Sequence, residues 1–197
     1  MEKANAFSNQ DATILRGAEQ SENLHAKGLY EVECFDGNGN LKWSDHINNT
    51  VTNIGANQLL NSAFGSGPVA GPFLGLISSV GYTGVPAVTD TMSSHPTWNE
   101  AGNGSNFPLW STPASNARAS VTFAAASNRI IALPSKAQFI IATTGGTVKG
   151  AFLVFGTGAV ATNNDTNGSL YSAGLFAAGD KVVSVGDTLQ VSYQTSV

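Results

Sequence analysis

The sequence predicts an all-β fold: an antiparallel, jelly-roll-like β-sandwich with one short helix and an extended N-terminal arm. Short stretches with strand periodicity follow one another through the second half of the chain, separated by glycine-rich turns. Only one segment, IGANQLLNSAF, has the pattern of a helix, whereas a parallel sheet would need a crossover helix between successive strands. A chain of 197 residues is long enough for one such domain.

Residues 1–27 are polar and show no sustained strand or helix periodicity. Their one short apolar group contains Ile14 and Leu15. Two interpretations stay open, because such a segment can be a frayed terminus or an extended arm that becomes ordered on a neighbouring subunit. The predicted organisation is therefore an arm over residues 1–27, followed by a single β-sandwich domain over residues 28–197.

A half-buried strand is predicted from residue 28 onward. Tyr30, Val32 and Cys34 alternate with two glutamates, so these three side chains share one face of the strand. Cys34 therefore points inward, where a thiol behaves as a small hydrophobic group with a raised pKa. The DGNGN stretch at residues 36–40 then predicts a tight hairpin, because glycine and asparagine accept the positive φ angles of such turns.

The single predicted helix follows at residues 54–64. We expect Asn53 to cap it, since asparagine is among the preferred N-cap residues. Leu59, Leu60, Ala63 and Phe64 fall on one side of this helix, and the glycines that follow end it. A short apolar strand is predicted over residues 73–80.

A long loop is predicted over residues 81–117, and its segment DTMSSHPTWNE at residues 90–100 groups several chemically active side chains. Asp90 and Glu100 would suit glycoside hydrolysis if they faced each other, with Trp98 as a platform for a sugar ring. The favoured interpretation is structural. We expect the two carboxylates to bond to backbone groups and Trp98 to pack on the core or on a partner.

Composition and charge disfavour several function classes. The chain has 9 basic and 13 acidic residues and no cluster of Lys and Arg, so direct nucleic-acid binding is not expected. One cysteine and three scattered histidines give no predicted metal site, and no nucleotide-binding or serine-hydrolase motif is present. No cofactor and no enzymatic activity are therefore expected. The sequence also shows no signal peptide and no apolar run of about 18 residues that would span a membrane.

Four motifs, in this order and spacing, resemble a group of small structural proteins encoded by tailed bacteriophages. They are GLYEVECFDGNGNLKWSDHINNTVTNIGANQLLNSAF, DTMSSHPTWNE, KGAFLVF and GDTLQVSY, and the resemblance spans about residues 28–193. It implies a virion structural protein. The role we expect is that of a capsid cement or decoration protein, made in the host bacterial cytoplasm, that binds the major capsid protein on the capsid exterior.

The expected partners are the major capsid protein and further copies of the chain, as a dimer or a trimer. Aromatic residues dominate the binding energy of many interfaces. The predicted contact residues are accordingly Trp98, Phe107 and Trp110 of the long loop, together with Ile14 and Leu15 of the arm.

Two other functions remain open from the sequence. A tail-associated or receptor-binding protein would recognise glycans through an exposed platform formed by Trp43, Trp98 or Trp110. A wall-degrading enzyme would place Asp90 and Glu100 on opposite sides of a cleft.

Overall fold

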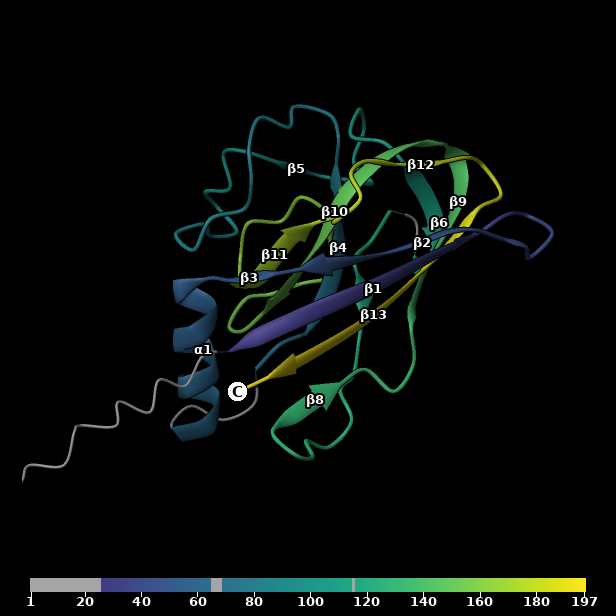
Figure 1. Cartoon of the computed structure of the whole chain (residues 1–197). Coiled ribbons are helices and arrows are strands. Elements are labelled where there is room, and N and C mark those ends of the chain that lie inside the picture. Colours follow the sequence, from purple (N-terminus) through teal and green to yellow (C-terminus); the bar gives the residue numbers. More distant parts are fainter. Residues whose placement is uncertain (1–25, 65–68, 115) are drawn as a thin grey trace, which may run out of the picture.

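The structure, a computed structural model, describes residues 26–64, 69–114 and 116–197. Two antiparallel sheets pack face to face in it as a sandwich, which confirms the predicted fold class (Figure 1). One sheet has the order β2-β1-β13-β9-β6 with β8 also paired to β13, and the other has the order β3-β11-β10-β4-β5 with β12 on β10 and β7 on β4. The strands are β1 (Lys27–Phe35), β2 (Leu41–Asn48), β3 (Thr50–Val51), β4 (Phe73–Ser78), β5 (Asn99–Glu100), β6 (Leu109–Thr112), β7 (Ala119–Ser120), β8 (Ile130–Ala132), β9 (Ala137–Thr144), β10 (Gly146–Phe155), β11 (Ser169–Leu175), β12 (Lys181–Val183) and β13 (Thr188–Ser196).

Strand β1 begins at Lys27, the last residue of the predicted arm; residues 1–25 of that arm lie outside the described residues. Across β1, Tyr30, Val32 and Cys34 are buried, as the alternation in the sequence predicts. The strand pairs with β2 on one side and along its whole length with β13 on the other. The first described strand and the last therefore lie side by side in the same sheet.

The predicted hairpin at residues 36–40 joins β1 to β2. The carboxylate of Asp36 accepts the backbone N–H groups of Asn38, at 2.9 Å, and of Asn40, at 2.8 Å. These bonds lower the pKa of the Asp36 carboxyl below its usual value. The carboxylate thus stabilises a tight turn.

The main core fills the space between the two sheets and includes Tyr30, Phe139, Leu153 and Val191. A second, smaller core lies on the other face of the β10 sheet, where the segment that follows β4 covers it. Strand β10 is consequently apolar on both faces, and residues 150–156 are all buried. Two-sided burial explains why GAFLVFG is a continuous apolar run without strand alternation.

Among the described residues one helix is present, α1 (Asn53–Phe64), which packs on β11. The predicted cap at Asn53 is wrong by one position. The N–H of Gly55 donates to the Thr52 hydroxyl at 3.0 Å, and the N–H of Ala56 donates to the Thr52 carbonyl at 2.9 Å. Thr52 fills the position because it is buried and its hydroxyl also donates to the Leu170 carbonyl of β11.

The contact between α1 and the sheet depends on a glycine rather than on the predicted apolar side. Gly55 is the buried residue of the helix, and a Cβ atom there would lie 2.4 Å from the Tyr171 carbonyl oxygen. Leu59 is partly buried against the core, whereas Leu60 is 54% exposed and Phe64 is 86% exposed. The helix therefore presents most of its apolar side chains outward.

Within the described part of the chain, no helix combines the length and the apolar character needed to cross a membrane.

Candidate interaction surface

Glu100, one of the two carboxylates singled out in the sequence, forms an ion pair inside the protein. Its two carboxylate oxygens accept the Nε and Nη2 groups of Arg118, both at 2.8 Å. Arg118 also donates to the carbonyl oxygens of Val160, at 3.1 Å, and of Asp165, at 2.7 Å. Glu100 is 3% exposed and Arg118 is 1% exposed. This carboxylate joins loop segments and is not free to exchange a proton with a substrate.

Asp90, the second carboxylate, is also buried, at 5% exposure, and its Oδ2 accepts the backbone N–H of Ala87 at 2.9 Å. It therefore closes a local turn, in line with the structural interpretation. Because both carboxylates are buried and bonded within the chain, Asp90 and Glu100 do not form the open acid pair that the glycoside-hydrolysis alternative requires.

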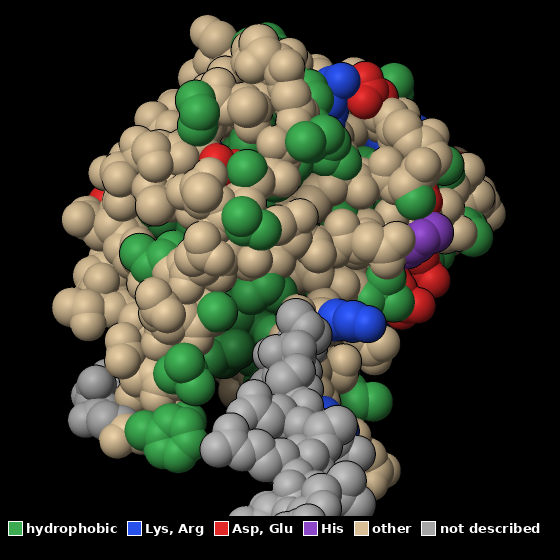
Figure 2. Space-filling model, turned by 60° about the vertical axis from the view of Figure 1, so that its left-hand side comes forward, with side chains coloured by type: hydrophobic (Ala, Val, Ile, Leu, Met, Phe, Trp, Pro, Cys, Tyr) green, Lys and Arg blue, Asp and Glu red, His purple; other side chains and the backbone are tan. Residues whose placement is uncertain are grey.

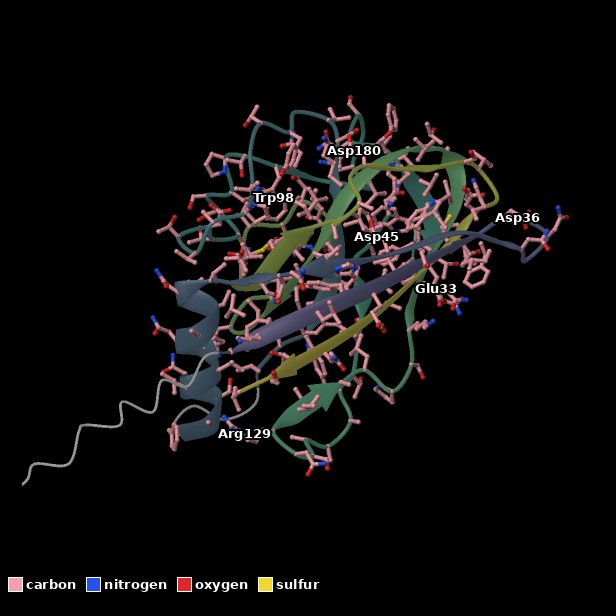
Figure 3. All side chains as sticks on the ribbon, viewed as in Figure 1. Glu33, Asp36, Asp45, Trp98, Arg129 and Asp180 are labelled. Carbon is pink, nitrogen blue, oxygen red and sulfur yellow. The ribbon has the colours of Figure 1, made fainter. Side chains whose placement is uncertain are left out.

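Trp98 and Trp110, both predicted as interface contacts, are buried within the chain, which for Trp98 is the core packing that the sequence left open as an alternative. Trp98, which is labelled in Figure 3, is 2% exposed. Its ring stacks on His95 at 4.0 Å between ring centroids and packs on Phe152 at 5.1 Å. Trp110 is 1% exposed and meets Phe139 edge to face at 5.0 Å. Burial of a large aromatic surface within the chain stabilises each ring where it lies.

Of the other predicted contact residues, Phe107 is half-buried, and its carbonyl accepts the Ser78 hydroxyl at 2.8 Å. Ile14 and Leu15 lie outside the described residues. The predicted set is thus not brought together as one aromatic surface.

Trp43, the third tryptophan of the predicted glycan platform, is half-buried on β2. Its Nε1 donates to the Val182 carbonyl at 3.3 Å, and the ammonium of Lys181 lies 5.6 Å from the ring centroid. With Trp98 and Trp110 buried, the three rings do not form an exposed platform.

Cys34 lies near the C-terminal end of β1, beside a charged pair formed by Asp187 and Lys42. Its Sγ is 3.8 Å from Oδ2 of Asp187, which in turn accepts the Lys42 ammonium at 2.5 Å. Burial, followed by the nearby Asp187 carboxylate, raises the pKa of the Cys34 thiol to about 12. This confirms the inward thiol expected from the sequence. Among the residues that the structure describes, no group of three or more His, Cys, Asp or Glu side chains could hold a metal ion.

Residues 46–89 contain no Asp, Glu, Lys or Arg. Parts of this uncharged stretch form a continuous surface. Two parts of this stretch, α1 and the loop at residues 79–89, meet where the N–H of Asn53 donates to the Val88 carbonyl at 2.8 Å. We call these two segments the uncharged face. Its exposed apolar side chains are Ile54 (37%), Leu60 (54%), Phe64 (86%), Val80 (38%), Val85 (67%) and Val88 (49%).

Figure 2 shows the side of the molecule that carries α1. Hydrophobic side chains are distributed over it among uncharged polar groups, and charged side chains are few. Beside the loop at residues 79–89 lies a hollow of about 500 Å³, lined by Tyr82, Val85, Lys149 and Asp180 among others. Lys149 pairs with Asp180 at 2.9 Å and its ammonium lies 4.6 Å from the Tyr82 ring centroid, so the first charges appear at the border of the face.

The contact residues predicted from the sequence belong to the aromatic loop and to the N-terminal arm, and none of them belongs to the uncharged face. The signal that would have found it is the long interval without charge, since about one residue in four of an ordinary globular chain is charged. A depletion of charge is typical of the central part of protein interfaces. Comparison of the chain with protein-family models, with curated proteins and with solved structures found no match.

Proposed function

We propose that the protein is a bacteriophage virion structural protein, a capsid cement that binds the shell of major capsid protein from the outside and stabilises it. The resemblance of the sequence motifs to small phage structural proteins supports the class of protein. The observation that carries the binding role is the uncharged face, on which Leu60 and Phe64 are more than half exposed.

The physical argument for this surface is the desolvation of apolar groups without the burial of charge. Each fully buried Leu or Phe side chain contributes about 1.5 to 3 kcal/mol, whereas a buried unpaired charge would cost several kcal/mol. Since α1 contains no Asp, Glu, Lys or Arg, a partner can cover it without stranding a charge. Such a surface fits an apolar region of another protein.

Cementing would use this contact many times over. A shell presents the same joint in many copies, and self-association into a dimer or trimer would raise the effective concentration of each further contact. Moderate affinity per copy then suffices to hold a shell together. The expected location of the protein is the capsid exterior.

The experiment adds purified protein to emptied shells that lack decoration and images them by electron microscopy. Ordered density at regular joints of the lattice, with α1 turned toward the shell, is the expected result. Bare shells, or protein bound to tails instead, would contradict the cement role and would favour the tail-associated alternative.

Two matched variants test the surface itself. Leu60→Glu and Phe64→Glu keep a good helix former but place a charge on the uncharged face, and each should weaken shell binding by about 10- to 100-fold. Leu41→Glu is the control, because Leu41 is 57% exposed, close to the 54% of Leu60, but lies on β2 beside the β1–β2 hairpin. Equal losses in the control and the two variants would rule out α1 as the contact.

A further inference from the structure

The sequence contains three Asn-Gly pairs, at residues 38–39, 103–104 and 167–168, and the structure describes all of them. In such a pair the backbone nitrogen of the glycine can attack the side-chain amide of the asparagine, because glycine has no Cβ atom to obstruct the approach. The reaction releases ammonia and needs only water as a reactant. The pairs are alike in sequence, but their surroundings in the structure differ.

The pair Asn38–Gly39 lies in the hairpin between β1 and β2, where hydrogen bonds hold the attacking nitrogen. The N–H of Gly39 donates to the Asp36 carbonyl at 2.9 Å. The N–H groups of Asn38 and Asn40 both donate to the Asp36 carboxylate. Attack therefore requires this turn to open first, and the carboxylate beside it disfavours the deprotonated form of the Gly39 nitrogen.

The pair Asn167–Gly168 precedes β11, and here the side-chain amide itself is held. Nδ2 of Asn167 donates to the Asp165 carboxylate at 3.2 Å, and the backbone N–H of Asn167 donates to the same carboxylate at 2.8 Å. Gly168 is closely packed, since a Cβ atom there would lie 2.7 Å from Cβ of Ala159. The amide cannot turn toward the Gly168 nitrogen without losing its bond to Asp165.

The pair Asn103–Gly104 has neither restraint. It lies in the loop between β5 and β6, where the N–H of Asn106 donates to the Asn103 carbonyl at 2.6 Å and the N–H of Gly102 donates to the Asn106 carbonyl at 2.8 Å. Gly104 and Ser105 lie outside these two bonds and are exposed. Within the described part of the chain, no backbone carbonyl accepts the Gly104 N–H, and the space where a Cβ atom of Gly104 would lie is open.

We propose that Asn103 is a modification site, at which the chain deamidates spontaneously and faster than at Asn38 or Asn167, because its loop leaves the attacking nitrogen free. The Gly104 nitrogen bonds to Cγ of Asn103 and closes a succinimide ring. The Cγ–Nδ2 bond breaks, and the amide leaves as ammonia with the proton that the Gly104 nitrogen gives up. Water then opens the ring at either of its two carbonyl groups, which yields aspartate or isoaspartate. The proposal does not depend on the proposed function.

The modification changes the loop in two ways. Residues 101–117 contain no Asp, Glu, Lys or Arg, so the new carboxylate is the first charge in this interval. Isoaspartate also adds a methylene group to the backbone between residues 103 and 104, inside the turn that the Asn106 bonds close. Deamidation should therefore loosen the segment that leads into β6.

The test incubates the full chain at mildly alkaline pH and follows each pair by tryptic digestion and mass spectrometry. The three pairs fall in three different tryptic peptides, residues 28–42, 43–118 and 150–181. In the folded protein we expect the peptide with Asn103 to deamidate about 5- to 10-fold faster than the other two, the effect of one hydrogen bond at each of those sites. After unfolding in guanidinium chloride, the three rates should become similar.

Two variants identify the site and the cause. Asn103→Gln should remove the fast deamidation of residues 43–118, which contain other asparagines. Asp165→Ala removes the carboxylate that holds Asn167, while Arg118 bonds to the backbone carbonyl of residue 165 and keeps its partner. This variant should raise the rate at Asn167 several-fold and leave the rate at Asn103 unchanged.

A rate at Asn103 no greater than at Asn38 or Asn167 in the folded protein would overturn the proposal. A difference that persists unchanged in guanidinium chloride would also overturn it, because the neighbouring sequence, and not the conformation of the loop, would then be the cause.

Discussion

Arg118 and Glu100 face each other in a bidentate ion pair, with both N–O distances 2.8 Å, in a part of the protein from which water is almost excluded. Two further N–H groups of the guanidinium donate to backbone carbonyls of the loop between β10 and β11. The N–H of Asn164, in the same loop, donates to Glu100 at 2.8 Å. One arginine thus joins three segments that are far apart in the sequence.

Replacement of one partner should therefore destabilise the protein strongly. We expect Arg118→Met to lower the free energy of unfolding by about 3 to 5 kcal/mol, because Glu100 is left buried and unpaired. Adding Glu100→Gln to that variant should recover part of the loss. Urea unfolding measures both effects. Lys136→Met, which breaks an exposed pair with Glu33, should change the free energy of unfolding by less than about 1 kcal/mol. Similar changes for Arg118→Met and Lys136→Met would show that the buried ion pair matters no more than the exposed one.

The helix cap gives a second expectation. Thr52→Ala removes the hydroxyl that accepts the Gly55 N–H and donates to Leu170, and should cost about 0.5 to 2 kcal/mol in urea unfolding. Asn53→Ala should change stability by only a few tenths of a kcal/mol, since Asn53 is the first residue of α1 and is exposed. A larger loss of stability for Asn53→Ala than for Thr52→Ala would show that Asn53 is the N-cap, as the sequence predicts.

Gly55→Ala should destabilise the fold although alanine favours helices. The added Cβ would lie 2.4 Å from the carbonyl oxygen and 2.6 Å from the Cα of Tyr171, and these backbone atoms cannot move independently of β11. We expect a net cost of about 1 to 3 kcal/mol by thermal or urea unfolding, more than the helix propensity gain of about 1 kcal/mol. Asn57→Ala, on the exposed side of the helix, is the control and should be neutral or slightly stabilising. Increased stability of Gly55→Ala would show that α1 can move away from the sheet.

Cys34 should make stability depend on alkaline pH. Folding raises the pKa of this thiol from 9.0 to about 12, so the folded protein holds the proton at pH values where the unfolded chain releases it. The contribution of the thiol is complete below pH 9.0 and is lost progressively as the pH rises toward about 12. Urea unfolding between pH 8 and pH 11 should show a shallower decline for Cys34→Ala. Identical slopes for the two proteins would contradict the raised pKa.

The two-sheet architecture could be predicted because strands such as β1 carry apolar residues on one face and polar residues on the other. The alternation at Tyr30, Val32 and Cys34 specifies which side of β1 is buried, and the burial in the structure agrees. Asp36 and the glycines beside it likewise specify a tight turn through local hydrogen bonds alone. Information of this kind lies within a few neighbouring residues.

The features that could not be predicted depend on contacts between distant segments. Thr52 and Asn53 are both suitable caps, and the Leu170 carbonyl, distant in the sequence, decides between them. Trp98 could equally face a partner or the core, and its contact with Phe152 on β10 decides its burial. The uncharged face was not predicted for another reason. It is defined by the absence of charged residues, and motif searches look for residues that are present.

The pairing of Lys27 with Ser196 at one end of the sandwich (Figure 1) has a consequence for protein engineering. A short linker can join these two ends, so the β1–β2 turn, at the opposite end of the same sheet, can be opened to create new termini. A circularly permuted chain cut between Asn38 and Gly39 keeps every strand intact. A peptide fused at that cut would project from the end of the molecule opposite to Lys27 and Ser196.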